Sequence, residues 1–312
     1  KSGDYKPYIY KTENYGKSWN LIVNGMGNED FTRALRADPK KKGLLYAGTE
    51  RGMYVSFDDG ANWQKFQLNL PVVPITDLAV KDDQLIAATQ GRSFWMIDDL
   101  TPLHQTQTNM ENRSMVLFQP KDAYRMSGGS GAKSKTAGVN HYGGLPVYFF
   151  VKDTSRSDTL NLSFYDAKKQ LIRKYTTHPD EKKKEGQLKV KPGSNVFYWD
   201  LTYPSAEKVE GMILWWASLS GPTALPGKYA VVLESREEKI EQYFNLLKDP
   251  RNKSTEQELQ QQFDFLVEVR DKMTETHLAL KNITKAREQI SVLEGSIDDK
   301  VKYKDLLTEA ER

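Results

Sequence analysis

Residues 56–63, Ser-Phe-Asp-Asp-Gly-Ala-Asn-Trp, decide how the N-terminal part of this chain folds. The same spacing of hydroxyl, Asp or Asn, Gly and Trp recurs in residues 12–19, Thr-Glu-Asn-Tyr-Gly-Lys-Ser-Trp. The pattern has a physical basis, because Asp58 can accept backbone N–H bonds inside a tight turn, Gly60 tolerates a positive φ and Trp63 can anchor the returning strand. Each stretch therefore predicts a folded hairpin rather than a catalytic site.

Both stretches have the pattern of an Asp-box, and we assign their pattern residues a structural role in the turns. The first box carries Asn where Asp is usual, a change that such a turn tolerates. The structural Asp-box residues are Thr12, Asn14, Gly16 and Trp19 in the first box and Ser56, Asp58, Gly60 and Trp63 in the second.

A longer repeat surrounds the boxes. Residues 45–49, Leu-Tyr-Ala-Gly-Thr, are echoed 40 residues later by Leu-Ile-Ala-Ala-Thr, and each copy is followed by a turn and another apolar strand. Repeats of about 40 to 50 residues with four short strands apiece are typical of β-propeller blades. We expect a partial propeller, its last two to three blades. One blade has strands at 31–38, 44–49, 53–57 and 63–68, and the last has strands from 75, at 85–89 and at 93–97, where the box has decayed.

Two and a half blades cannot close a propeller, because each blade buries its faces only against its neighbours. The chain begins at Lys1 without a start methionine or a targeting segment. We therefore expect the missing N-terminal blades of a longer protein, or a partner chain, to complete the propeller.

A domain boundary is expected near Asn112, after a polar linker at 105–113, so that residues 1–112 hold the blades. Residues 113–247 then predict an immunoglobulin-like or fibronectin-like β-sandwich, because about seven short strands alternate with turn signals. We expect these strands at 115–118, 147–152, 159–165, 170–176, 186–190, 195–201 and 227–234, with 243–247 finishing the sandwich. In the strand at 195–201, Phe197, Trp199 and Leu201 share one face, which we take as the core face.

Two stretches of the second region could carry recognition. Residues 127–144 form a Gly- and Ser-rich loop for which we favour disorder over a binding role. Residues 212–216, Met-Ile-Leu-Trp-Trp, are expected to form a strand that places Trp215 and Trp216 on opposite faces, with at least one at an interface. Packing against the propeller and ligand contact are both open for these tryptophans.

Residues 248–312 predict a C-terminal α-helical hairpin. Thr255 and Glu258 form a capping box ahead of a long helix that reaches Leu293, with Gly295 as its stop. We expect its apolar stripe to comprise Leu259, Phe263, Leu266, Met273, Leu280 and Ile283. A return helix from Asp298 or Val301, with Tyr303, Leu306 and Leu307, would cover that stripe. His277 beside the stripe is expected to be a packed histidine rather than a metal ligand.

Composition narrows the class of protein. The net charge of +3 is spread along the chain, and the lysines at 182–184 lie among acidic residues, so we expect no nucleic-acid partner. No membrane span is expected, since no stretch of 18 apolar residues occurs. The absence of cysteine excludes disulfides and thiol catalysis. The content of 16 tyrosines and 6 tryptophans favours an exported, extracytoplasmic β-protein.

The boxes, together with Gly91-Arg92-Ser93-Phe94-Trp95 and the residues up to Leu103, resemble the large bacterial BNR/Asp-box repeat proteins with a sortilin-like propeller. Residues 199–201, 225–227 and 247–251 and the long helix are similar to the C-terminal region of that family. The resemblance covers nearly the whole chain and implies a long exported protein with propeller, sandwich and helical tail. Family members are often labelled glycosyl hydrolases. Gln90 stands where many relatives have histidine, which removes a possible site residue.

The leading hypothesis is a propeller-based binding or scaffold protein that recognises a protein, peptide or glycan. The alternative is a glycoside hydrolase acting on polysaccharide, with its catalytic carboxylates in blades N-terminal to this chain. Glycoside cleavage usually needs a pair of carboxylates across a sugar cleft, and the aspartates here form no such pair. We assign no catalytic, cofactor or metal residue. Arg92 is the position that could face a propeller channel, although an inter-blade clamp is the favoured role.

Overall fold

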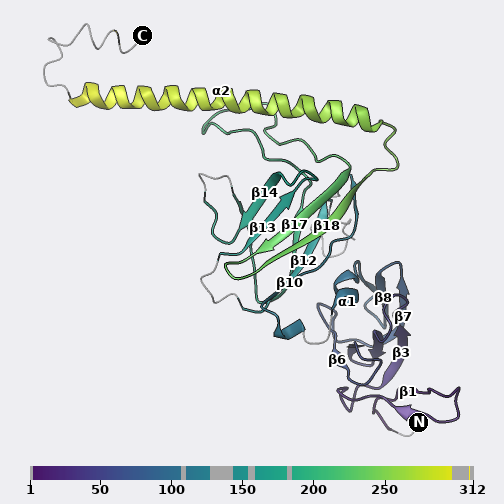
Figure 1. Ribbon diagram of the computed structural model, residues 1–312. Helices are drawn as coiled ribbons and strands as arrows, with labels where there is room; N and C mark the ends of the chain where they lie inside the picture. The colour runs from purple at the N-terminus through teal and green to yellow at the C-terminus, as the bar shows by residue number, and fades with distance from the viewer. Residues whose placement is uncertain are drawn as a thin grey trace. The chain divides into compact units, whose positions relative to one another are not determined.

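The computed structural model describes residues 3–106, 110–126, 143–153, 159–180, 185–296 and 309. The protein is mainly β, with 35% of residues in strands and 17% in helices. The chain divides into two compact units, 1–114 and 115–312, and each unit is described by itself (Figure 1).

The first unit contains three antiparallel sheets whose strands follow chain order. The first sheet pairs β1 (Tyr10–Lys11) with β2 (Asn20–Leu21). The second contains β3 (Thr32–Ala37), β4 (Leu45–Thr49), β5 (Gly52–Ser56) and β6 (Gln64–Lys65). The third contains β7 (Ile75–Lys81), β8 (Gln84–Thr89) and β9 (Phe94–Ile97). The strand expected at 63–68 is thus only two residues long.

Each box turn joins two neighbouring antiparallel strands of one sheet. The box at 12–19 joins β1 to β2, and the box at 56–63 joins β5 to β6, the third and fourth strands of their sheet. The decayed box after β9, again a third strand, leads instead into a short helix, α1 (Thr101–Gln105). The sequence pattern did not predict this helix. The second and third sheets therefore repeat in phase, whereas the first sheet has only two described strands.

Apolar side chains of the second and third sheets share one core. It includes Leu44, Tyr46 and Val55 from one sheet and Ile75, Leu78 and Leu85 from the other. At Gly48 a Cβ atom would lie only 2.6 Å from Ile75 Cγ2. Glycine thus allows the close approach of β4 and β7.

The second unit contains two sheets. A three-stranded sheet has the order β10 (Met115–Leu117), β12 (Leu145–Val151), β16 (Gly193–Trp199). A six-stranded sheet has the order β11 (Ala123–Arg125), β18 (Lys239–Lys248), β17 (Gly227–Glu234), β13 (Asn161–Tyr165), β14 (Leu171–Thr176), β15 (Gly186–Gln187). The sequence predicted each of these strands except β11. A short 3-10 turn (Met110–Asn112) precedes β10.

One hydrophobic cluster joins the two sheets of this unit. Trp199 is fully buried and stacks on Phe164 with ring centroids 4.5 Å apart. Its neighbours Val196 and Tyr198 are exposed, so the predicted core face of β16 is confirmed. The alternation works because successive side chains of a strand point to opposite faces.

The long helix α2 (Glu256–Ser296) ends one residue beyond the expected stop at Gly295. Its capping box is confirmed: Thr255 N donates to Glu258 Oε2 at 2.8 Å, and Glu258 N donates to Thr255 Oγ1 at 3.2 Å. In Figure 1 the helix crosses one end of the second unit and extends past it. Within the described part of the chain, neither helix combines the length and apolarity needed to cross a bilayer.

Only half of the expected apolar stripe of α2 packs. Leu259 is buried, and Phe263 and Met273 are partly buried. The other three residues of the stripe are exposed: Leu266, Leu280 and Ile283. The helix instead turns Thr274, His277 and Lys281 towards the rest of its unit, through the polar contacts described below. His277 is buried, as expected for a packed histidine.

Three predictions fall outside the described residues: the disordered loop for all but its last two residues, the lysines at 182–184, and the return helix with Tyr303, Leu306 and Leu307.

Candidate functional site

The two Asp-boxes form the same hydrogen-bonded turn. In the second box Ser56 Oγ donates to Asp58 Oδ1 at 2.8 Å, Asn62 N donates to the same oxygen at 2.8 Å, and Gly60 N donates to Ser56 Oγ at 2.9 Å. Burial raises the pKa of Asp58, but hydrogen bonds from Asn62 and Ser56 outweigh it and leave the pKa lowered. The Asp58 carboxylate therefore serves the turn.

The first box repeats these bonds with a neutral residue. Thr12 Oγ1 donates to Asn14 Oδ1 at 3.1 Å, Ser18 N donates to Asn14 Oδ1 at 2.9 Å, and Gly16 N donates to Thr12 Oγ1 at 2.8 Å. Gly16 and Gly60 both have φ 88°.

The two box tryptophans differ in their surroundings. Trp63 is buried, and its Nε1 donates to Ile22 O at 2.9 Å, which ties the second box to the hairpin of the first. Trp19 remains 57% exposed. The anchoring role of this position is therefore visible at Trp63, whereas Trp19 leaves a large apolar surface uncovered.

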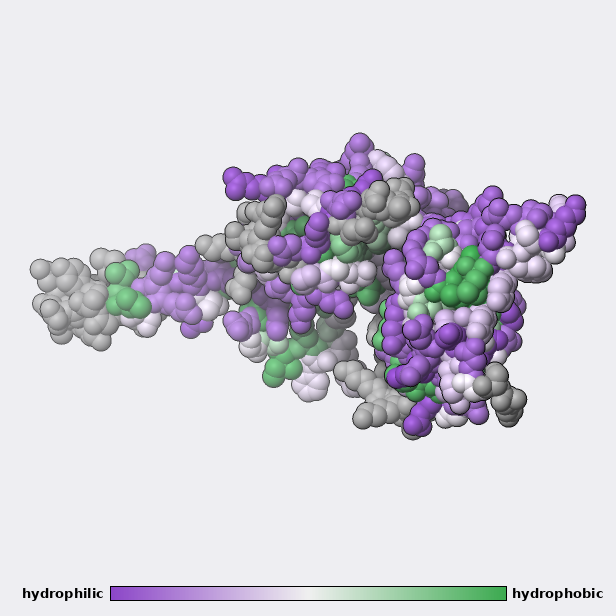
Figure 2. Space-filling model, turned by 90° about the horizontal axis from the view of Figure 1, so that it is seen from below, coloured by the Kyte–Doolittle hydropathy of each residue, from purple (hydrophilic) through white to green (hydrophobic). Residues whose placement is uncertain are grey.

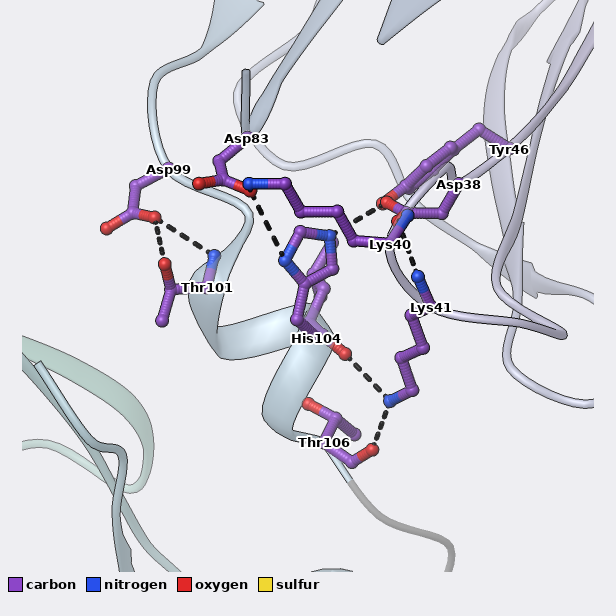
Figure 3. Close-up of polar contacts among 10 residues, drawn as sticks. Asp38, Lys40, Lys41, Tyr46, Asp83, Asp99, Thr101, His104 and Thr106 are labelled. Carbon is purple, nitrogen blue, oxygen red and sulfur yellow. Dashed lines mark hydrogen bonds and ion pairs between the residues drawn. The ribbon is translucent and has the colours of Figure 1, made fainter. Parts of the chain in front are cut away.

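A charged cluster lies where α1 meets the turn between β3 and β4 (Figure 3). His104 Nε2 is 2.9 Å from Asp38 Oδ2, and its Nδ1 is 3.7 Å from Asp83 Oδ1. Tyr46 Oη donates to Asp38 Oδ2 at 2.9 Å, while Lys40 N and Lys41 N donate to Asp38 Oδ1 at 2.8 and 2.9 Å.

This cluster fastens a helix rather than presenting a reactive group. Burial raises the pKa of Asp38, but bonds from His104, the two lysine amides and Tyr46 together lower it. Burial and the bond to Asp38 raise the pKa of Tyr46. Lys41 Nζ donates to Leu103 O at 2.9 Å and to Thr106 O. The sequence did not reveal this cluster. Its one local signal is at the start of α1, where Asp99 Oδ1 accepts a bond from Thr101 N at 3.0 Å, one residue before Pro102.

The arginines of the first unit are scattered, as the sequence suggested. Arg33 pairs with Glu50 at 2.5 Å, Arg51 with Glu29 at 2.9 Å, and Arg36 with Asp77 at 2.6 Å between β3 and β7. Arg92 lies exposed in the turn between β8 and β9, where its carbonyl accepts Trp95 Nε1 at 2.9 Å. The described residues include no three His, Asp or Glu placed to hold a metal ion.

An apolar turn stands out in the second unit. On the face drawn in Figure 2 most residues are hydrophilic, and hydrophobic residues gather in a few small patches. Residues 212–216 are nonetheless apolar at every position, and Trp215 and Trp216 are 90% and 98% exposed. The predicted strand is absent here: Met212 N bonds Val209 O at 3.4 Å, Ala217 N bonds Leu214 O at 2.6 Å, and Trp215 has φ 35°. Both tryptophans are consequently exposed, rather than one.

This turn is the tip of an anchored hairpin, residues 202–223, which we call the tryptophan hairpin. Its two arms are joined by the bridge between Thr202 and Thr223, by Tyr203 N to Pro222 O at 2.9 Å and by Ala206 N to Leu219 O at 2.8 Å. The arms approach so closely at Gly221 that a Cβ atom there would lie 2.1 Å from Tyr203 O.

One arm is also bonded to α2 through Glu207. Glu207 N donates to Thr274 Oγ1 at 3.2 Å, His277 Nδ1 is 2.5 Å from Glu207 O, and Lys281 Nζ pairs with Glu207 Oε1 at 2.5 Å. Tyr203 packs edge-on against Phe263, with ring centroids 5.0 Å apart. The base of the hairpin is therefore fixed on two sides, and the exposed tip lies several residues beyond these contacts.

A cleft of about 450 Å³ lies beside the same arm. Its walls are residues 171–174 of β14, Glu185, and residues 204–208 of the hairpin. Lys174 Nζ pairs with Glu185 Oε1 at 2.8 Å. The guanidinium of Arg173 lies over the Tyr175 ring at 5.3 Å.

No protein-family model and no curated protein matches this chain. Among solved structures it is similar to the extracellular domain of a proposed one-component system from B. thetaiotaomicron, at a TM-score of 0.24 and 11% identity, over 78% of this chain and 28% of that one. It is also similar to the extracellular domain of a proposed hybrid two-component system from the same organism, at a TM-score of 0.26 and 11% identity, over 76% of this chain and 29% of that one. The chain thus spans less than a third of either structure. Likeness at these scores is too low to carry an argument about fold or function.

Proposed function

We propose that this chain is part of an extracytoplasmic binding or scaffold protein, built on an Asp-box β-propeller of the BNR and sortilin-like kind, that recognises a protein, peptide or glycan. The observation that carries the binding role is the tryptophan hairpin. Its base is bonded to α2 and its tip exposes two neighbouring indole rings. Large aromatic side chains held on a rigid support lose little entropy on binding and dominate many interfaces.

The position of the box turns within their sheets supports the propeller. The box at 56–63 and the decayed box after β9 each follow the third strand of an antiparallel sheet, as expected for repeated blades. The outermost sheets also leave apolar faces uncovered: Phe94 and Met96 of β9 at one end, and Tyr10, Trp19 and Leu21 at the other. Blades that pack against further blades would cover such faces.

The shared core of the second unit supports the sandwich. Inward side chains of the three-stranded and six-stranded sheets meet in one cluster around Trp199. Two sheets packed over alternating inward residues describe a β-sandwich. We propose that it supports the tryptophan hairpin and α2.

The bonding of the acidic residues favours binding over hydrolysis by these blades. Asp58 is committed to its turn, Asp38 accepts four bonds in the α1 cluster, and Asp77 pairs with Arg36. A glycosidase needs one carboxyl group free to protonate the leaving oxygen and a second to act on the sugar. These three carboxylates are held by structural donors instead.

The test compares the wild-type chain with the variant Trp215→Ala/Trp216→Ala. Each is presented to a phage-displayed peptide library and to a panel of soluble polysaccharides in affinity gels, with a reducing-end assay run beside the gels. We expect a ligand in one panel whose binding is lost in the variant, without new reducing ends. Trp19→Ala serves as the matched control, since Trp19 is an exposed tryptophan of the other unit. Binding that survives the double substitution, or no ligand in either panel, would refute the proposal.

A further inference from the structure

The tip of the tryptophan hairpin offers a ligand apolar surface and few polar groups. Residues 211–227 include no ionisable side chain, and the nearest one before them is Glu210. Apart from the two indole N–H groups, the side chains of residues 212–216 have no strong hydrogen-bond donor or acceptor. Beyond the tip, the hydroxyls of Ser218 and Ser220 bond to each other at 3.0 Å. The tip can therefore hold a ligand by apolar contact but not by ion pairs.

The side chains of the tip stand clear of the rest of the chain. Ile213 is 80% exposed, and Trp215 and Trp216 are exposed more fully still. A flat surface would cover one side of these side chains and leave the other side in water. The free energy of apolar contact grows with the area removed from water, so the best ligand places apolar groups on several sides of the tip.

This chemistry favours a peptide over a glycan. A sugar ring carries several hydroxyl groups, and burying a hydroxyl group without a hydrogen bond costs free energy. Specific sites therefore add placed polar groups to their apolar walls, and the side chains of the tip supply only two indole donors. Ile213 also adds apolar area without an aromatic face on which a sugar could stack. Apolar peptide side chains require no hydrogen bonds, so they match the whole tip.

We propose, building on the binding role proposed above, that the tip binds an apolar, uncharged peptide segment of a partner protein, which packs around Ile213, Trp215 and Trp216. The turn bond from Ala217 N to Leu214 O already satisfies part of the tip's backbone, which lowers the cost of removing the turn from water. Affinity comes from apolar area, to which the aliphatic and the aromatic side chains both contribute. Because no ion pair takes part, salt has little effect on binding.

The two panels of the binding test separate this inference from the proposed function on which it rests. We expect ligands only among the displayed peptides, with apolar residues enriched and charged residues depleted in the selected sequences. A polysaccharide whose binding is lost in Trp215→Ala/Trp216→Ala would uphold the binding role and overturn the apolar peptide. Charged sequences among the best peptides would likewise overturn it. No ligand in either panel would refute the binding role, and this inference with it.

The best selected peptide, made synthetically, is then titrated into the whole chain by calorimetry. We expect Ile213→Ser to weaken its binding at least about tenfold, whereas Val72→Ser, at a 71% exposed aliphatic residue of the first unit, should leave it unchanged. Melting temperatures of both variants should match that of the wild type, since both side chains are exposed. The dissociation constant should change less than about twofold between about 50 and 500 mM salt. Unchanged binding in Ile213→Ser, or binding that weakens steeply with salt, would overturn the proposal.

Discussion

At the scale of single residues, the two Asp-boxes show that the turn requires an acceptor oxygen rather than a charge. Asn14 Oδ1 and Asp58 Oδ1 accept the backbone N–H four residues on at 2.9 and 2.8 Å. Each also accepts the hydroxyl of the residue two before it. The natural difference between the boxes is therefore conservative at Oδ1, while at the second atom Asp58 Oδ2 accepts Asn62 Nδ2 and Asn14 Nδ2 donates to Ser18 Oγ.

A pair of substitutions at Asp58 tests this equivalence. Asp58→Asn keeps the Oδ1 acceptor but replaces Oδ2, which accepts Asn62 Nδ2 at 2.7 Å, with an amide donor, and should cost only about 0.5 kcal/mol. Asp58→Ala leaves the Asn62 amide and the Ser56 hydroxyl without their acceptor and should cost about 1–2 kcal/mol. Urea unfolding of both variants measures the difference. Equal costs for the two would show that the carboxylate charge is what matters.

The lowered pKa values of Asp38 and Asp58 predict an acid-sensitive first unit. Each carboxyl has a lower pKa when folded than when unfolded, so its contribution to stability is present above the unfolded pKa and is lost as the pH falls through the folded one. Stability of the first unit should decline below about pH 4. Unfolding midpoints from pH 6 to pH 2 measure this, and Asp58→Asn should flatten the decline. A midpoint independent of pH would contradict the assignment.

The residue scale also shows what the sequence could predict. The positions of Asp58 and Trp199 follow from local patterns, a turn signature and an alternating strand. The contact between His104 and Asp38 joins residues 66 positions apart, and neither lies in a motif. Only the fold brings them together, so the cluster could not be found from spacing.

At the scale of elements, α2 shows how polar contacts can decide which face of a helix packs. The sequence correctly predicted its start and nearly its end. Half of the apolar stripe is nevertheless exposed, and Thr274, His277 and Lys281 bond the backbone and carboxylate of Glu207 in the tryptophan hairpin. Hydrophobic periodicity takes only apolar residues into account, so it could not predict these polar contacts with Glu207.

Two leucines on the helix distinguish the packed face from the exposed one. Leu259 is 4% exposed and Leu266 is 40% exposed. Leu259→Ala should lower the free energy of unfolding by about 2 kcal/mol or more, whereas Leu266→Ala should change it by less than about 1 kcal/mol. Chemical unfolding of the two variants is the measurement. A larger effect of Leu266→Ala would show that the packed face of α2 contains Leu266 rather than Leu259.

Two glycines of the tryptophan hairpin separate crowding from backbone strain. A Cβ at Gly221 would lie 2.1 Å from Tyr203 O, and one at Gly211 would meet no atom within 4 Å although its φ is 77°. Gly221→Ala should force the arms apart and cost about 2 kcal/mol or more, while Gly211→Ala should cost about 1 kcal/mol. Hydrogen exchange across residues 203–222 should rise much more in the first variant. Equal exchange in both would mean that the arms are not held together.

At the scale of the whole molecule, each unit has its own core. The clusters of the first unit lie between Ile9 and Leu103, and that of the second lies between Met115 and Leu246. The sequence predicted the mainly β character and the terminal helix, because alternation and capping are local. It could not predict which surfaces stay open, since that depends on long-range pairing. The exposed turn at 212–216 is the clearest case.

The binding role of the tryptophan hairpin is tested most directly by the dissociation constant of the best panel ligand for the wild type and for Trp215→Ala/Trp216→Ala. We predict at least about 30-fold weaker binding in the variant, because an interface anchored by tryptophan loses about 2 kcal/mol or more on truncation. The melting temperature should stay unchanged, since the two side chains are 90% and 98% exposed. Equal dissociation constants for the two proteins would contradict the account.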